Sequence, residues 1–499
     1  MADHITPEYA ADIPPVDPAA KGDEPVPPAA PKPEKQPSEQ SPGLIVILAV
    51  AAISSLIVGL RSYEEAEGLE MWTFANNHEA MYRPMLPEIN DDLPEGSQVD
   101  LKLIAYPAMQ RRMLSGFASG TPTADLLEVE GGMAASVFAG PLEDIGFTDI
   151  TDKLREEGLL ERLNPPSLSP WTKQGRIFGL PHDVHPVMLG YRADLIEAAG
   201  VDVDQIETWD DFERVMRPLR EDFDGDGRWD RYPLAVWPTN MADMRTLFLQ
   251  AGGGLFDPQG QPQLDHPRNI DVAARVVSWS GGPDAIAAEV ADSNQAGNQL
   301  RVEGFVLSEL VPDWMAGVWK KDVKGLAGKV KLMPLPAWEP GGLRTSVQGG
   351  SMLAISDMTD DFDTAWTFAK KLYLDRDLAQ TLFETTCIVS PVVEYWDAEF
   401  YDEPVEFYSG QPIGRMFLDL APEVPLRGTS PFRSSAEARM TDAMYKLLTY
   451  ARQNNVWDPE ALRPEAERLL RYAQGEVVEQ IERNPFVQST TRPTSRMAP

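Results

Sequence analysis

Cysteine is almost absent from this 499-residue chain, and basic residues are scarce relative to acidic ones. Cys387 is the only cysteine, which excludes an intramolecular disulfide and a cysteine-based zinc site. Lysine and arginine total 44 against 78 aspartate and glutamate, a formal net charge of −34. Proteins bind nucleic acid and anionic lipid surfaces mainly through cations, so this balance argues against both partners. The length implies at least two lobes, and 43% hydrophobic residues suffice for their cores.

The first 60 residues differ from the rest. Residues 1–42 contain eleven prolines, eight acids and three lysines. With so little to bury, this segment is expected to be a disordered, Pro-rich tail. The next eighteen residues, 43–60, contain no charge, and as a helix they would span about 27 Å, close to the thickness of a hydrocarbon core.

The apolar run could also be a core helix or a cleaved signal peptide. A core helix would show a polar stripe, and a signal peptide would follow a short basic region rather than a long acidic one. An uncleaved transmembrane anchor is the preferred interpretation. The flanking Lys32, Lys35 and Arg61 weakly favour a cytoplasmic tail and a large extracytoplasmic domain on the periplasmic face of the cytoplasmic membrane.

Strand and helix patterns alternate after the anchor. Strands are expected over Leu69–Phe74, Val99–Ala105 and Ala124–Val129, with a helix from about His78 to Asp91 between the first two. A second helix, which begins after Pro107, should end at Gly120. Further along, Thr208 and Asp211 have capping-box spacing, and residues 362–373 form an apolar helical face. This alternation predicts an α/β fold with a mostly parallel sheet.

Six segments, in order, resemble motifs of the family 1 extracellular solute-binding proteins of ABC importers, the group of maltose-binding and glycerol-phosphate-binding proteins. The resemblance covers about Leu69 to Val392. The segments are GFASGTPTAD (116–125), GRIFGLP (175–181), YRADLIEAAG (191–200), TWDDF (208–212), LQAGGG (249–254) and QGGSMLAIS (348–356).

The resemblance implies a two-lobed periplasmic-binding-protein clamp (type II-like) whose lobes close on a ligand by hinge bending. The chain should cross between the lobes near Val184–Leu189 and again near Val311–Trp314. The expected division is a disordered tail at 1–42, an anchor at 43–60, an N-lobe at 61–185 with 314–375, a C-lobe at 190–312 with 376–483, and a flexible C-terminal tail at 484–499.

The family's ligands are mostly oligosaccharides and polyols, which need aromatic rings beside short polar side chains. For Trp72 and Tyr106, ordinary core packing is about as plausible as ligand contact, whereas Trp314 is the best single candidate. The positions implied to contact ligand are Trp72, Tyr106, Glu130, His182, Asp183, His185, Trp237, Trp314, Gly349, Gly350 and Ser351.

The segment His182-Asp183-Val184-His185 also offers metal-ligand side chains. In an extended segment, positions 182 and 185 point to opposite faces, so ligand hydrogen bonding is favoured over a metal site.

A second motif favours a structural Ca²⁺. Residues 222–230 (DFDGDGRWD) place acids at loop positions 1, 3, 5 and 9 and glycine at position 6, as in a calcium loop, although Pro233 replaces the usual glutamate at position 12. A solvated Asp-Gly turn is the alternative. The candidate metal residues are Asp222, Asp224, Asp226, Arg228 and Asp230.

No Gly-x-Ser-x-Gly, P-loop or dinucleotide motif occurs, and no enzyme or catalytic cofactor is predicted. The predicted function is a membrane-tethered receptor that delivers a carbohydrate-like solute to an ABC permease. The alternative is a sensory or scaffold module that signals through its Pro-rich tail.

Overall fold

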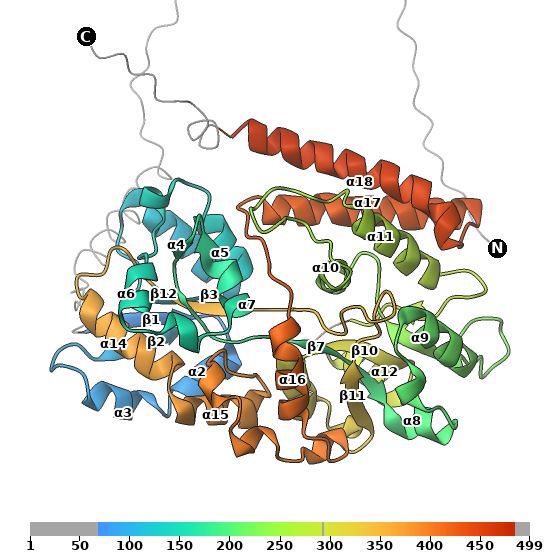
Figure 1. Ribbon diagram of the computed structural model, residues 1–499, viewed down its shortest axis with the longest axis horizontal. Helices are drawn as coiled ribbons and strands as arrows, with labels where there is room; N and C mark the ends of the chain where they lie inside the picture. The colour runs from blue at the N-terminus through green and yellow to red at the C-terminus, as the bar shows by residue number, and fades with distance from the viewer. Residues whose placement is uncertain (1–67, 292–293, 485–499) are drawn as a thin grey trace, which may run out of the picture. The chain divides into compact units, whose positions relative to one another are not determined.

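The computed structural model describes residues 68–291 and 294–484. The predicted Pro-rich tail and the predicted anchor at residues 43–60 lie outside these ranges. None of the helices in the described part of the chain is long and apolar enough to cross a membrane. These described residues belong to one compact unit, which contains two five-stranded sheets (Figure 1).

The two sheets are built from strands that are not consecutive in the chain. The first has the order β2-β1-β3-β12-β6 and the second the order β11-β7-β10-β8-β9. The first sheet contains β1 (Leu69–Thr73), β2 (Val99–Leu103), β3 (Leu126–Glu130), β12 (Ser351–Ile355) and β6 (Leu180–Pro181). The second contains β11 (Val330–Pro334), β7 (Val187–Arg192), β10 (Val306–Pro312), β8 (Tyr232–Ala235) and β9 (Ala287–Ala288), and a separate hairpin pairs β4 (Thr172–Lys173) with β5 (Arg176–Ile177).

Helices cover both faces of each sheet. Those of the chain's first third are α2 (Asn76–Tyr82), α3 (Leu86–Asp91), α4 (Tyr106–Ser119), α5 (Gly131–Val137), α6 (Thr151–Glu156) and α7 (Pro165–Leu168). Those of the middle are α8 (Ala193–Ala198), α9 (Trp209–Met216), α10 (Met241–Gln250), α11 (Pro267–Trp279), α12 (Gln295–Glu303) and α13 (Asp313–Asp322). The remaining helices are α14 (Phe362–Tyr373), α15 (Arg376–Thr386), α16 (Ile413–Leu420), α17 (Arg433–Asn454) and α18 (Pro459–Glu482).

Alternation along the strands gives each sheet two cores. In β1, Met71 faces the core under α2, α3, α14 and α15, whereas Trp72 faces the core under α4 and α5. The second sheet likewise packs one face on α9, α10, α11, α17 and α18, and the other on α13 and α16. Helices α17 and α18 contact each other and α11, as Figure 1 shows in red and green.

Several local predictions are confirmed. Helix α4 ends where Gly120 adopts the left-handed conformation (φ 64°), which glycine reaches without strain. Thr208 and Asp211 form both hydrogen bonds of a capping box at the start of α9, and α14 spans the predicted residues. The predicted helix from His78 to Asp91 is two helices, because Pro84 cannot continue α2.

The sheets and their crossings differ in part from the prediction. Both sheets are mixed rather than mostly parallel. In the first sheet β12 pairs antiparallel with β3 and β6, and in the second β7 pairs antiparallel with β10 and β11. The chain leaves the first sheet after Pro181 and enters the second at Val187, a connection that overlaps the first predicted crossing at Val184–Leu189. The chain crosses back to the first sheet between Pro334 and Ser351, not near 311–314. The reason is that β11, which ends at Pro334, still pairs with β7 in the second sheet.

One segment therefore sits with a different sheet from the one expected. Residues 330–334 belong to the second sheet although 314–375 was placed in the N-lobe. Helix α15 was placed in the C-lobe; its Leu378 and Leu382 pack in a core of the first sheet and its Ala379 and Phe383 in a core of the second, so this placement stays a prediction. The remaining lobe boundaries stay a prediction.

Candidate functional site

A chain of polar side chains links elements of the two sheets. The hydroxyl of Tyr106, in the first turn of α4, donates to Glu130 at the end of β3 (3.0 Å). Glu130 also accepts from the amide of Gly132 (2.6 Å) and lies 3.4 Å from Arg433 of α17. Burial and the neighbouring charge of Glu130 raise the pKa of Tyr106, so Tyr106 stays neutral. Two predicted ligand residues thus lie side by side, and they face arginines that the sequence did not indicate.

Glu437 extends this chain to a third helix. It accepts from Nε of Arg433 (2.9 Å) and pairs with Arg245 of α10. Burial opposes ionisation of Glu437, but the two arginines outweigh it and lower its pKa. The polar chain therefore runs from β3 of the first sheet and α4, which packs on that sheet, to α10 and α17, which pack on the second sheet.

The segment before β12 adds backbone groups to the site. Gly349 and Gly350 have φ values of 112° and 122°, in a region that favours glycine. A Cβ at Gly349 would lie 2.9 Å from both His185 and Trp314, so the segment is closely packed. Trp314 donates to the carbonyl of Gln348 (2.8 Å), and Arg427 donates to the carbonyl of Gly349.

Three predicted ligand residues, His182, Asp183 and His185, are buried at the first crossing. The carboxylate of Asp183 contacts Nδ1 of His182 (3.1 Å) and Nε2 of His185 (2.9 Å) and accepts from the amide of Ser351 (3.2 Å). The expectation that the two histidines diverge is wrong: the segment is not fully extended, since His185 adopts φ 59°. Both rings reach the same aspartate.

His185 also binds Asp313 at the start of α13 (Nδ1 to Oδ1, 2.5 Å). Burial would lower the pKa of His185, but Asp183 and Asp313 overcome it and raise the pKa to about 10. The pKa of Asp183 is held well below its usual range, against burial, by the two histidines. This pair of carboxylates around one imidazolium joins the crossing segment to α13.

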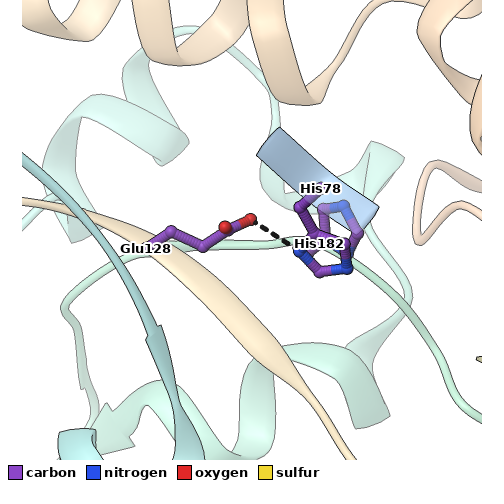
Figure 2. Close-up of side chains that lie close together, drawn as sticks. All are labelled: His78, Glu128 and His182. Carbon is purple, nitrogen blue, oxygen red and sulfur yellow. Dashed lines mark hydrogen bonds and ion pairs between the residues drawn. The ribbon is translucent and has the colours of Figure 1, made fainter. Parts of the chain in front are cut away.

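A second buried cluster lies beside this one and was not predicted. Figure 2 shows Glu128 of β3 reaching toward the rings of His78 and His182, whose centres are 4.3 Å apart. The Glu128 carboxylate contacts His78 (3.1 Å), Tyr82 (2.7 Å), Tyr373 (2.6 Å) and Thr73. Burial would raise the pKa of Glu128, yet His78 and the other donors lower it to about 2.

Two groups of described residues place three candidate metal-binding atoms within 4.8 Å of one another: His78, Glu128 and His182, and the loop residues Asp222, Asp224 and Asp226. In the first group Glu128 is already saturated by protein donors, so this cluster is explained as a polar core without an ion. Nε2 of His182 has no hydrogen-bond partner within the described residues, and burial lowers the pKa of His182.

The predicted calcium loop turns its carboxylates onto its own backbone. Asp222 accepts from the amides of Gly225 (2.7 Å) and Gly227 (2.9 Å), and Asp230 accepts from the amide of Phe223 (2.7 Å). The amide of Arg228 donates to Asp226 (2.8 Å). Asp224 and Asp226 are exposed, and Asp230 does not join the close group of three.

The predicted tryptophans Trp72, Trp237 and Trp314 lie in three different surroundings. Trp72 is 9% exposed and donates to Glu70. Trp237 lines a cavity of about 200 Å³ together with Asn240, and the guanidinium of Arg452 lies 5.8 Å from its ring centre. Trp314 is half-buried and packs against the cores of both sheets.

Two cavities meet at Arg427 and Thr429, and together they form what we call the Arg427 groove. The larger, of about 790 Å³, is lined by residues from the segments 138–141, 165–177, 258–261 and 426–432 and by Ile481; Lys173 and Arg427 are its cations. The smaller, of about 80 Å³, lies against Gly349, Arg245 and Arg433. Sequence reasoning missed Arg245, Arg427 and Arg433, and only Gly349 of the predicted residues lines the groove.

Two sheets joined by crossing segments, with polar groups gathered at the crossing and in a groove beside it, define a two-lobed binding-protein fold. Residues 94–377, more than half of the chain, match the family described as bacterial extracellular solute-binding protein, and the chain belongs to this family. The resemblance inferred from six short motifs is therefore confirmed, and solute binding rather than catalysis is the function of the family.

Known relatives agree with this assignment. The arabinooligosaccharide-binding protein of Halalkalibacterium halodurans is 26% identical over 419 residues, which cover 81% of this chain and 89% of that protein. The protein of the same name from Bacillus subtilis is 25% identical over 334 residues, 65% of this chain and 74% of that protein. Among solved structures, the sugar-binding protein MalE of Xanthomonas citri is 16% identical, with a TM-score of 0.66 over 83% of this chain and 99% of that one.

Proposed function

We propose that this protein captures an oligosaccharide outside the cytoplasm by closing its two lobes and presents it to the permease of an ABC importer. The observation that carries the proposal is the polar chain from Tyr106 and Glu130 to Arg433 and Arg245, which links elements of the two sheets and whose two arginines line the smaller cavity. Relatives that bind arabinooligosaccharides support the choice of a sugar ligand.

Ligand titrations of the full-length protein test this function. Isothermal titration calorimetry with arabinooligosaccharides, galactobiose and lactose should reveal saturable binding, and small-angle X-ray scattering should show a smaller radius of gyration with the ligand bound. Tyr106→Phe combined with Glu130→Gln should weaken binding, whereas Glu88→Gln on the exposed surface of α3 should not. Absence of binding across a saccharide panel, acidic sugars included, would refute the proposal.

Residues 43–60 complete the proposal as a single-pass anchor that holds the binding domain at the outer face of the membrane. Their uncharged sequence supports this role. Full-length protein should stay with membranes washed in alkaline carbonate, and a variant without residues 43–60 should not. Recovery of the full-length protein in the wash would exclude the anchor.

The loop of residues 222–230 is proposed to bind a structural Ca²⁺ through Asp222, Asp224 and Asp226, with Arg228 and Asp230 completing the loop. Three carboxylates close together repel one another unless a cation compensates them, which supports the assignment. Calcium at about 100 times its Kd should stabilise the fold by about 2.7 kcal/mol. Differential scanning calorimetry should show this rise in Tm lost in Asp224→Ala and kept in Asp397→Ala; a rise that survives Asp224→Ala would place the ion elsewhere.

A further inference from the structure

The Arg427 groove has a charge opposite to that of the protein as a whole. The chain has 78 acidic and 44 basic residues, yet among the described residues that line the groove no carboxylate occurs. Four cations line it: Lys173, Arg245, Arg427 and Arg433. Because the chain is so acidic, a groove lined by this many residues without a single acid is a distinctive feature.

Two of these four cations form ion pairs with carboxylates that do not line the groove, and the other two form none with a described residue. Arg245 and Arg433 pair with Glu437 and Glu130. Arg427, by contrast, donates only to the carbonyl of Gly349, and its buried Nε has no hydrogen-bond partner within the described residues.

Lys173 resembles Arg427 in this respect. Its ammonium donates to the carbonyls of Phe138 (2.7 Å) and Gly140, and it forms no ion pair with a carboxylate of residues 68–291 or 294–484. Burial lowers the pKa of Arg427 to about 10 and also lowers the pKa of Lys173, so Arg427 remains a cation at neutral pH. Withdrawing a cation from water without a counter-charge is costly, and folded chains normally avoid it.

We infer that the solute is an acidic oligosaccharide whose anionic group is held by Arg427, with Lys173 at the far part of the groove. This inference rests on the proposed function. A uronic acid carboxylate is the group that best matches a planar guanidinium, which can bind two oxygens side by side. A sulfate or phosphate ester shares the same chemistry.

The rest of the groove suits the neutral part of such a ligand. Gln174, Gln259, Gln261 and Thr429 provide amides and a hydroxyl that can bind sugar hydroxyls. The larger cavity, of about 790 Å³, lies in the size range of small-molecule sites. A neutral sugar would fill the same space but leave Arg427 unpaired.

Matched ligands test the inference on the full-length protein. Digalacturonate and galactobiose have the same length and differ mainly in charge, and galactose 6-phosphate tests the phosphate ester. Digalacturonate should bind about 10- to 100-fold more tightly than galactobiose, the increment expected for hydrogen bonds to a charged group. Tighter binding of galactose 6-phosphate would also support an anionic ligand and would assign the group to phosphate.

Variants test whether the preference for digalacturonate over galactobiose depends on the cations of the groove. Arg427→Gln should remove the preference for digalacturonate, Arg427→Lys should retain part of it, and Lys173→Gln should weaken it. Arg468→Gln, which removes the same charge from the exposed surface of α18, is the control and should not change it. The Tm of each variant verifies folding, and Lys173→Gln keeps the test valid should Arg427→Gln fail to fold.

The outcomes separate this inference from the proposed function. Galactobiose that binds as tightly as digalacturonate, or more tightly, would overturn the acidic ligand and leave the oligosaccharide receptor intact. A charge preference that persists in both Arg427→Gln and Lys173→Gln would overturn the role of the groove. No binding of any saccharide would overturn both proposals.

Discussion

The buried polar groups of the first lobe and crossing contrast with those of the Arg427 groove. Glu128 and Asp183 are ionised and buried, and each is surrounded by donors from the chain itself. Arg427 and Lys173 are half-buried cations without a carboxylate partner among the described residues. A group that the protein satisfies completely stabilises the fold, whereas a group left with unused bonds is available to a ligand.

The first test of this contrast is at Glu128, where a large loss of stability is expected. Glu128→Gln removes the negative charge on which the buried donors His78, Tyr82 and Tyr373 converge, and its NH2 replaces an oxygen that accepts a hydrogen bond. We expect the free energy of unfolding to fall by about 2–4 kcal/mol, measured by urea denaturation. The exposed Glu88→Gln should leave stability unchanged. Equal stability of both variants would mean that the Glu128 cluster does not stabilise the fold.

A second prediction concerns how the stability of the crossing segment, through His185, depends on pH. The pKa of His185 is raised from 6.5 to about 10, so the folded state holds a proton that the unfolded state releases between these values. The stabilisation is complete below pH 6.5 and is lost as the pH rises toward 10, with a slope of about 1.4 kcal/mol per pH unit at most.

Thermal unfolding between pH 6.5 and 10 measures this slope. His185→Gln should be less stable at pH 6.5 and should lack the slope, because the titrating group is gone. The lowered pKa of His182 acts in the opposite direction and only below pH 6.5, where protonation favours the unfolded state. A wild-type protein whose stability is constant from pH 6.5 to 10 would contradict a charged His185.

Sequence patterns predicted the parts of this fold that depend on local interactions. The end of α4 at Gly120 and the capping box of α9 follow from residues within one or two turns. The crossing after β11 was missed because strand order depends on pairing between distant segments, here β11 with β7. Glu128 could not be recognised either: an acid in the strand Leu126–Glu130 reads as solvent-facing unless α2 and α14 are known to cover that face.

The candidate site was predicted only on its first-lobe side. Tyr106, Glu130 and Gly349 lie within the stretch from Leu69 to Val392 that resembles the family, and the structure brings them to the arginines. Arg427 and Arg433 lie beyond Val392, where the resemblance ended, and no local pattern marks an arginine whose partner is a distant carbonyl. An acid-free wall is visible only after residues up to about 340 positions apart have been placed together.

The smallest effect is expected for Arg427 itself in the ligand-free protein, and it tests the contrast most directly. Arg427→Gln loses a hydrogen bond to the Gly349 carbonyl but also removes a poorly compensated charge, so the free energy of unfolding should change by no more than about 0.5 kcal/mol. The matched arginine is Arg301, whose buried guanidinium binds both oxygens of Glu309 (2.6 and 2.7 Å). Arg301→Gln leaves that carboxylate buried without its cation and should cost about 3–5 kcal/mol. Urea denaturation of the two variants compares a structural arginine with a ligand-binding one. If Arg427→Gln proved as destabilising as Arg301→Gln, Arg427 would be a structural residue, and the groove would lose its reason to attract an anion.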